Sequence, residues 1–452
     1  MKRNVIVLIL SWFYVLGAGA STGKYRLSHW DDPATTVVIG WNQIDGDNPM
    51  VYYGSVDHGG NWESYPLAAE PTRSVDFAGM NNHFVRLSGL QPNTAYYFVI
   101  KDSDSASDRY WFKTAPDDPN TKLSIIAGGD SRNNRGPRIN GNILVSKLKP
   151  HVVFFGGDMT QSCTDEQWNR WMDDWQMSIS PDGRMFPIVP ARGNHESNDN
   201  YIYHLFDTPR NNESVYYALT FGGGLVRAYT LNTEIAINGD QSTWLTEDFA
   251  ANTMVRWKIA QYHKPMRPHA SGKSEGNEQY VNWASAFYDN NVKLVVESDA
   301  HMVKTTWPIK PSTENDSEEG FVRDDESGTV YVGEGCWGAP LRSNDDNKSW
   351  TRNSGKFNQF KWIFVDQSKI EVRTVKLENA PFVEENPNDS PFDIPKDLML
   401  WSPSNGKVAT IYHEDVTPPT ISLNAPAAGT ITAVGEVVTL EATSADSHGS
   451  IR

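Results

Sequence analysis

The chain is poor in cysteine, with only Cys163 and Cys336 among 452 residues. Domains held together by disulfides need many more cysteines, so this is not a disulfide scaffold. The sequence leaves two states open for this pair, a single disulfide in an oxidising compartment or two buried free thiols.

Positive charge is also scarce, because 40 Lys and Arg residues face 56 Asp and Glu residues and the formal net charge is −16. An acidic protein repels the phosphate backbone and anionic lipid headgroups. We therefore exclude a general nucleic-acid binder and a protein that docks electrostatically on a membrane. A hydrophobic fraction of 38% with 12% aromatic residues is enough for sizeable cores and excludes a disordered chain.

Long apolar runs are missing beyond the amino terminus. Residues 1–20 begin with Lys2 and Arg3, continue with an apolar run and end in Ala18-Gly19-Ala20. This pattern is typical of a secretory signal peptide cleaved after Ala20. The run is shorter than the roughly 20 residues that a membrane helix needs, which leaves a membrane anchor as the alternative. We expect a secreted or periplasmic protein whose mature chain has no membrane span.

Residues 22–115 contain short β-rich runs such as TTVVIGW and AYYFVIKD, separated by Gly, Asp, Asn and Pro. Their period-two character predicts an all-β domain. The stretch LSGLQPNTAYYFVI resembles the corner of a fibronectin type III sandwich, with Tyr96 as the corner tyrosine. We expect a scaffold domain, with a glycan or cell-surface contact as the alternative.

Residues 120–380 alternate strands with helical segments, which predicts parallel βαβ units. Residues 381–415 are rich in Pro and Asn and are expected to form an irregular linker or cover. Residues 416–452 resemble the opening of a bacterial immunoglobulin-like repeat, with too few strands for a sandwich. We interpret them either as a truncated domain or as a segment that is unstable as it stands.

Polar residues follow each predicted strand of the central region. They are Asp130, Asp158, Asn194 with His195, His263, and Asp299 with His301. The carboxyl ends of parallel strands form the edge where open α/β sheets bind ligands. The mixture of oxygen and nitrogen donors suits borderline divalent metals and trivalent iron.

The order of these motifs resembles the calcineurin-like metallophosphoesterase superfamily, in its purple acid phosphatase-like branch with a fibronectin-like domain in front. The matching stretches are GGDS (128–131), GGDMTQ (156–161), RGNHES (192–197), IAQYHKP (259–265) and SDAH (298–301). The resemblance covers roughly residues 25–380. It implies a multidomain fold: a β-sandwich, then an α/β phosphoesterase domain with mixed sheets flanked by helices, then the partial immunoglobulin-like segment.

The resemblance also implies a centre of two metal ions, iron, zinc or manganese. Asp130 and His301 would ligate the first ion, Asn194 and His263 the second, and Asp158 would bridge both.

This sequence departs from the family at two positions. The family has Gly-His-x-His where this chain has SDAH, so Asp299 stands at the position of the family's first His. Asp299 is either a retained oxygen ligand of the second metal or the mark of a degraded site, and we favour the ligand. Gln161 stands where the purple enzymes place a tyrosine, which predicts a colourless protein.

Two metals would clamp a phosphate and lower the pKa of a bridging water, whose hydroxide attacks phosphorus in line. His195 is the candidate to contact the phosphate or protonate the leaving oxygen, and Glu196 could orient it. His269 is a second acid candidate, on a loop expected to overhang the rim. Arg132 and Arg192 either bind phosphate oxygens or form ordinary salt bridges.

The sequence therefore predicts a secreted metal-dependent phosphatase that acts on phosphate monoesters. Three alternatives remain open: a phosphodiesterase or nucleotidase of the same superfamily, a covalent mechanism with Ser131 as nucleophile, and a non-catalytic surface-binding protein with a degraded metal site.

Overall fold

The computed structural model of the chain describes residues 21–413 and 420–445. The predicted signal peptide, residues 1–20, lies outside them. Among the described residues, no helix combines the length and apolar character needed to cross a bilayer. Cys163 and Cys336 are both buried and are not joined to each other.

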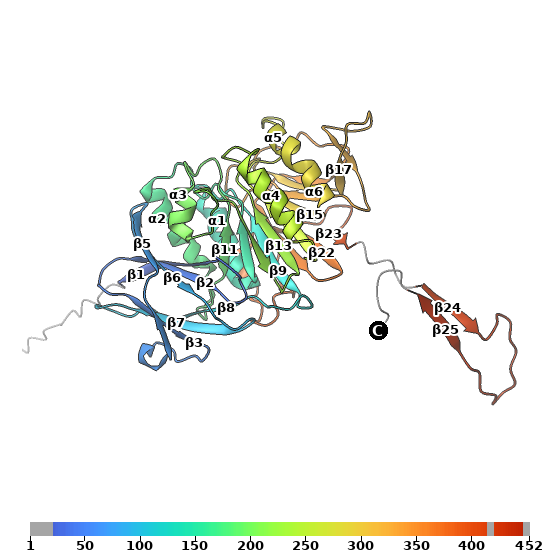
Figure 1. Cartoon of the computed structure of the whole chain (residues 1–452), viewed down its shortest axis with the longest axis horizontal. Coiled ribbons are helices and arrows are strands. Elements are labelled where there is room, and N and C mark those ends of the chain that lie inside the picture. The colour runs from blue at the N-terminus through green and yellow to red at the C-terminus, as the bar shows by residue number, and fades with distance from the viewer. Residues whose placement is uncertain (1–20, 414–419, 446–452) are drawn as a thin grey trace, which may run out of the picture.

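The first β-rich region forms two antiparallel layers around one core (Figure 1). One layer contains β1 (Thr22–Ser28), β2 (Val37–Gln43), β6 (Met80–Leu87) and β5 (Arg73–Phe77). The other contains β4 (Leu67–Ala69), β3 (Met50–Gly54), β7 (Ala95–Lys101) and β8 (Tyr110–Lys113). Trp41, Phe98 and Phe112 are buried between them. The Tyr96 hydroxyl accepts the backbone N–H of Gln91 at 2.9 Å, as a corner tyrosine does.

The first layer is part of a larger sheet that continues into the second region. Ten strands follow one another in the order β23 (Val408–Tyr412), β22 (Lys369–Lys376), β21 (Gln359–Val365), β9 (Leu123–Gly128), β10 (Val152–Phe155), β11 (Pro187–Pro190), β1, β2, β6 and β5. The junction is the parallel pair β1–β11, in which Leu27 lies opposite Pro187. Elsewhere between the two regions, the fully buried Asp207 forms ion pairs with Arg86 of β6 at 2.7 Å and with Arg73 of β5 at 3.1 Å.

A second sheet of seven strands packs against the first. Its order is β12 (Tyr217–Phe221), β13 (Val226–Thr230), β14 (Trp257–Gln261), β15 (Val292–Glu297), β19 (Val330–Gly333), β16 (Val303–Thr306) and β20 (Thr351–Gly355). In β15, Leu294 and Val296 join the core that contains Ile125 of β9, whereas Val295 joins a separate core with the helices. This alternation is what a strand buried on both faces requires.

Helices cover the two sheets. Within the core of the first sheet lie side chains of α1 (Arg135–Leu148), α2 (Asp165–Trp175) and α3 (Asn200–Phe206). The second sheet is covered by α4 (Asp240–Ala251) and α6 (Ser285–Asp289), with the short α5 (Asn277–Gln279) nearby (Figure 1). The Thr164 hydroxyl caps α2 by accepting the Gln167 N–H at 3.3 Å, and Asp165 and Glu166 complement the dipole of its first turn.

Of two predictions about the end of the chain, one differs from the structure and the other stays untested. The segment expected to be irregular contributes β23, which pairs with β22 at the edge of the large sheet. Two small hairpins complete the fold: β17 (Ile309–Pro311) with β18 (Phe321–Arg323), and β24 (Thr420–Ala425) with β25 (Glu441–Ala445). Because β24 and β25 are the only strands described after residue 413, the immunoglobulin-like domain stays a prediction.

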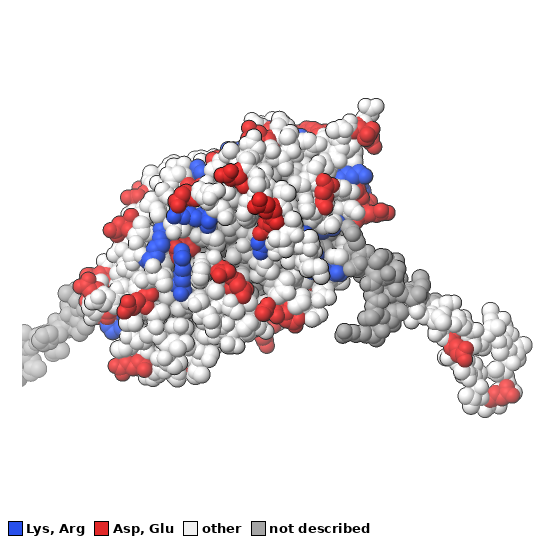
Figure 2. Space-filling model, in the orientation of Figure 1, with Lys and Arg blue, Asp and Glu red and all other residues white. Residues whose placement is uncertain are grey.

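Charge on the surface follows the composition. Acidic side chains are scattered over the face drawn in Figure 2, in keeping with the net charge of −16.

Candidate metal centre

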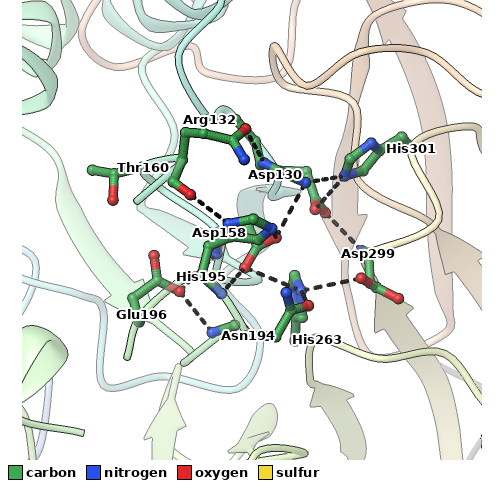
Figure 3. A network of polar contacts seen from close by, with 12 residues as sticks. Asp130, Arg132, Asp158, Thr160, Asn194, His195, Glu196, His263, Asp299 and His301 are labelled. Carbon is green, nitrogen blue, oxygen red and sulfur yellow. Dashed lines mark hydrogen bonds and ion pairs between the residues drawn. The ribbon is translucent and has the colours of Figure 1, made fainter. Parts of the chain in front are cut away.

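The polar residues that follow the central strands meet at one rim, between the two sheets. Asp130 follows β9, Asp158 follows β10 and Asn194 follows β11, all in the large sheet. His263 follows β14 and Asp299 follows β15, in the second sheet. Figure 3 shows these side chains pointing toward one another across the rim. The packing of two sheets thus brings together ligands that are up to 171 residues apart, from Asp130 to His301.

One group that could hold a metal ion consists of Asp130, Asp158 and His301, all buried, with ligand atoms within 4.8 Å of one another. His301 Nδ1 lies 3.0 Å from the Pro340 carbonyl oxygen, which can only accept, so Nδ1 carries the proton. This contact turns His301 Nε2 toward the centre, where it lies 3.1 Å from Asp130 Oδ1.

A second group consists of Asp158, His263 and Asp299, which are also buried. His263 Nδ1 donates to the Gly156 carbonyl at 2.8 Å, which turns Nε2 toward the centre. Three oxygens surround Nε2: Asn194 Oδ1 at 3.1 Å, Asp158 Oδ1 at 3.3 Å and Asp299 Oδ1 at 3.6 Å. Asp158 belongs to both groups, as a bridging ligand must.

Unpartnered oxygens show that the residues present fit metal ions. Asp130 Oδ1 and Asp158 Oδ2 are buried and accept no hydrogen bond among the described residues. A buried carboxylate oxygen without a partner carries a large desolvation cost. A metal ion at each group would remove that cost with the ligand set that this chemistry favours.

The carboxylates and imidazoles also shift one another's pKa. Burial alone would raise the pKa of Asp158, but the His263 imidazole outweighs it and holds that pKa low. Burial would lower the pKa of His263, but the charge of Asp158 raises it well above its usual value. Because a metal ion binds the deprotonated imidazole nitrogen, a metal ion at His263 would compete with a proton.

Four of these ligands have a strained backbone. The φ angles of Asp130, Asp158, Asp299 and His301 are 57°, 54°, 66° and 55°, all in the left-handed region that non-glycine residues seldom adopt. Such strain persists where the surroundings enforce it and is typical of functional sites. Gly193 packs directly against one of these ligands, because a Cβ there would lie 2.4 Å from Asp158 Oδ1.

Two side chains flank the ligands and remain open to a substrate. His195 Nδ1 donates to the Gln161 carbonyl at 2.5 Å, and its Nε2 lies 3.8 Å from Asp158 Oδ2. Arg132 Nη1 lies 3.2 Å from His301 Nε2 and 3.8 Å from Asp158 Oδ2. The Arg132 Nε donates to Gln161 Oε1 at 3.0 Å, so Gln161 positions both residues through different atoms.

Other residues singled out from the sequence lie elsewhere. Arg192 donates to the Glu196 carbonyl and to Asp199 Oδ1, each at 3.0 Å, so its guanidinium holds its own loop together. His269 does not overhang the rim as expected. It is fully buried, with Nε2 2.7 Å from Thr351 Oγ1 and Nδ1 3.2 Å from the Arg267 carbonyl. These contacts place neither residue beside the metal ligands.

Ser131 and Glu297 have structural partners. The Ser131 hydroxyl is buried, donates to the Met159 carbonyl and accepts from Trp171 Nε1, both at 3.0 Å, which leaves no free nucleophile. Glu297 ends β15 by accepting Tyr262 OH at 2.7 Å and Lys304 Nζ at 2.6 Å. It is an internal anchor of the strand that carries Asp299.

One residue at the site was missed by sequence reasoning. Lys273 Nζ lies 2.5 Å from Asp299 Oδ2. Burial would raise the pKa of Asp299, but His263 and Lys273 together lower it. Lys273 stands in a loop, SGKSEG, with no periodic pattern or motif that would have pointed to it.

Comparisons with known proteins agree with this geometry. Residues 24–114 match the family described as the purple acid phosphatase N-terminal domain, and residues 138–303 match the calcineurin-like phosphoesterase family. An uncharacterized Mycobacterium tuberculosis protein is 23% identical over 381 residues, which cover 71% of this chain and 70% of the relative. Purple acid phosphatase 15 of Arabidopsis thaliana is 23% identical over 273 residues, covering 48% of this chain and 49% of its own.

Solved structures share the fold. A purple acid phosphatase from yellow lupin (Lupinus luteus) seeds superposes with a TM-score of 0.66 and 16% identity, over 87% of this chain and 74% of that one. PhoD superposes with a TM-score of 0.61 and 12% identity, over 79% of this chain and 87% of that one. The chain therefore contains a calcineurin-like phosphoesterase domain behind a purple acid phosphatase N-terminal domain, and its two groups of carboxylates and imidazoles lie at the strand ends of the phosphoesterase domain.

Proposed function

We propose that this phosphoesterase is a secreted phosphatase that hydrolyses phosphate monoesters at a centre of two metal ions. The observation that carries the proposal is the pair of buried ligand groups that share Asp158. The purple acid phosphatase among its relatives supports the choice of a phosphatase.

Asp130, Asp158 and His301 would hold the first metal ion, and Asp158, Asn194, His263 and Asp299 the second. When bound, such a pair supplies Lewis-acid activation of the phosphate and lowers the pKa of coordinated water. The ions are iron, zinc or manganese in our proposal. Gln161 cannot supply a tyrosinate, so we expect no purple colour.

His195 is proposed to protonate the leaving oxygen. Its Nδ1 is fixed by the Gln161 carbonyl, so the ring presents Nε2 to the rim, and the side chain is 23% exposed there. A general acid needs this combination of fixed orientation and access to the substrate. Arg132 is proposed to bind a non-bridging phosphate oxygen, because its Nη1 faces ligands of both groups.

The test combines metal content with activity. Elemental mass spectrometry of the purified, untreated protein should find about two transition metal ions per chain. Asp158→Ala should lose both metal and hydrolysis, because it removes the shared ligand. Hydrolysis of p-nitrophenyl phosphate should exceed that of bis(p-nitrophenyl) phosphate, and the reverse order would favour a phosphodiesterase.

A protein that takes up no metal after incubation with zinc, manganese or iron would support the surface-binding alternative. Export has its own test: the intact mass of the secreted protein should correspond to a chain that begins at Ser21. A cell-surface contact through the amino-terminal β layers stays a prediction.

A further inference from the structure

The two carboxylate oxygens of Asp299 contact different neighbours. Its Oδ1 lies 3.6 Å from His263 Nε2, on the side of the metal ligands, and its Oδ2 lies 2.5 Å from Lys273 Nζ. Asp299 is only 6% exposed, so water is a minor partner for either oxygen. One oxygen is thus available to a metal ion while the other is held by a cation.

Charge explains why the second oxygen needs that cation. The resemblance implies a neutral imidazole at position 299, and Asp299 adds a third carboxylate beside Asp130 and Asp158. An additional negative charge at the rim would repel a dianionic phosphate and would weaken the metal as an electron acceptor. An ammonium group in direct contact with Asp299 offsets that charge.

Lys273 is also placed to reach a substrate. It lies in the loop that leads from His263 to α5, and its side chain is 21% exposed. Together with Asp299, Lys264 and Thr233 it lines a cavity of about 510 Å³. An ammonium group has three hydrogen-bond donors, and Asp299 is the only partner of Lys273 Nζ within the described part of the chain. Two donors remain for a ligand in the cavity.

We propose that Lys273, held by Asp299, binds a phosphoryl oxygen of the substrate. The Asp299–Lys273 pair then carries no net charge, like a neutral ligand, and adds a contact to the phosphate. This inference rests on the phosphatase function proposed above. It assigns the part of the cavity beside Asp299 and Lys273 to the phosphate and the remainder to the leaving group.

The test measures phosphate affinity directly. Isothermal titration of the metal-loaded protein with inorganic phosphate should give a Kd that rises about tenfold in Lys273→Met, since a charge-assisted hydrogen bond is lost. Lys273→Arg, which keeps the charge, should recover most of that affinity. Metal content should remain two ions per chain in both variants, because Asp299 Oδ1 is untouched.

Lys264→Met is the matched control. Lys264 lines the same cavity, but its Nζ is paired at 2.8 Å with Glu234, which is not among the metal ligands. Its Kd for phosphate should change less than about twofold. Equal effects of the two substitutions would overturn the proposal, because they would indicate a general loss of positive charge in the cavity.

A double-mutant cycle tests whether the pair acts as a unit. In Asp299→His the neutral ligand is restored, so removing Lys273 no longer leaves an unpaired carboxylate near the phosphate. Lys273→Met should therefore weaken phosphate binding less in the Asp299→His background than in the wild type. Additive effects would overturn the pairing.

The two levels of inference fail differently. A wild-type protein that takes up no metal or binds no phosphate would overturn the proposed function and this inference with it. A metal-loaded wild type that binds phosphate no better than Lys273→Met would overturn only the role of Lys273. Loss of metal in Lys273→Met would also overturn that role, since Lys273 would then serve to retain the metal.

Discussion

A carboxylate oxygen of Glu196 accepts the backbone N–H of Asp158 at 2.8 Å. The same oxygen accepts the Gly193 N–H, and the other oxygen accepts the Met159 N–H, both at 2.8 Å. Glu196 is fully buried, so these bonds join the loop after β10 to the loop after β11 away from water. The sequence alone allows Glu196 to orient His195, whereas its contacts in the structure fix the backbone of the bridging ligand.

Glu196→Gln should lower both stability and metal affinity. Gln would put a side-chain NH2 group where a carboxylate oxygen of Glu196 accepts a backbone N–H. Two donors would then face each other, at a cost of about 1–3 kcal/mol in the free energy of unfolding. Urea denaturation and metal titration measure the two effects. The exposed Glu247→Gln on α4 is the control and should change neither. A Glu196→Gln protein with wild-type metal affinity would contradict the positioning role.

Gly193→Ala should reduce metal content while leaving the fold intact. The new Cβ would lie 2.4 Å from Asp158 Oδ1 and 2.9 Å from His263 Cε1, so both ligands must move. Gly136→Ala on α1 meets no atom within 4 Å and should be neutral or stabilising by up to about 1 kcal/mol. Metal content per chain, with circular dichroism as the check on folding, separates the two outcomes.

His195→Asn should slow hydrolysis by about 10²–10⁴-fold for substrates with poor leaving groups. The loss should be much smaller for p-nitrophenyl phosphate, whose leaving group needs little protonation. His269→Asn is the matched comparison: it should lower the free energy of unfolding, because His269 is fully buried, and leave the dependence on leaving group unchanged. The same loss for both kinds of substrate in His195→Asn would argue against a general acid.

Stability should depend on pH through Lys361. Burial lowers the pKa of this β21 lysine from 10.5 to about 7, although Nζ donates to Thr374 Oγ1 at 2.9 Å. Between those two values the unfolded chain binds the proton more readily than the folded one, so stability falls as pH falls from about 10.5 to about 7.

Lys361→Met removes this titration. The wild type should lose up to several kcal/mol more than the variant between pH 10 and pH 7, at about 1.4 kcal/mol per pKa unit. Urea midpoints at both pH values measure the difference, with the exposed Lys396→Met as control. If the stability of the wild type and of Lys361→Met changed in parallel with pH, the proposed titration of Lys361 would be refuted.

The ligand set could be predicted from the sequence because apolar runs show where the buried strands end. Apolar runs before Asp130, Asp158 and Asp299 predict buried strands, and parallel strands present their carboxyl ends together. The contacts of His269 could not be read that way. Its neighbours Thr351 and Glu334 come from distant segments, so only the folded chain shows that it turns inward.

Lys273 and β23 escaped prediction for related reasons. A lysine in a Gly- and Ser-containing loop has the composition of any solvated turn, and its partner Asp299 is 26 residues away. The β23 segment lies in a Pro-rich stretch, and its strand forms because β22 offers an unpaired edge.

Because β1 pairs with β11, the amino-terminal domain cannot be removed without damaging the second region. An amino-terminal domain attached only by the linker between β8 and β9 could be cut away and the remainder kept. Here its removal would strip β11 of a neighbour, expose a strand edge that attracts other chains and leave Asp207 buried without its two arginines. A shortened version for engineering should therefore begin before β1, and a protease that cleaves the linker should yield fragments that stay together until they are denatured.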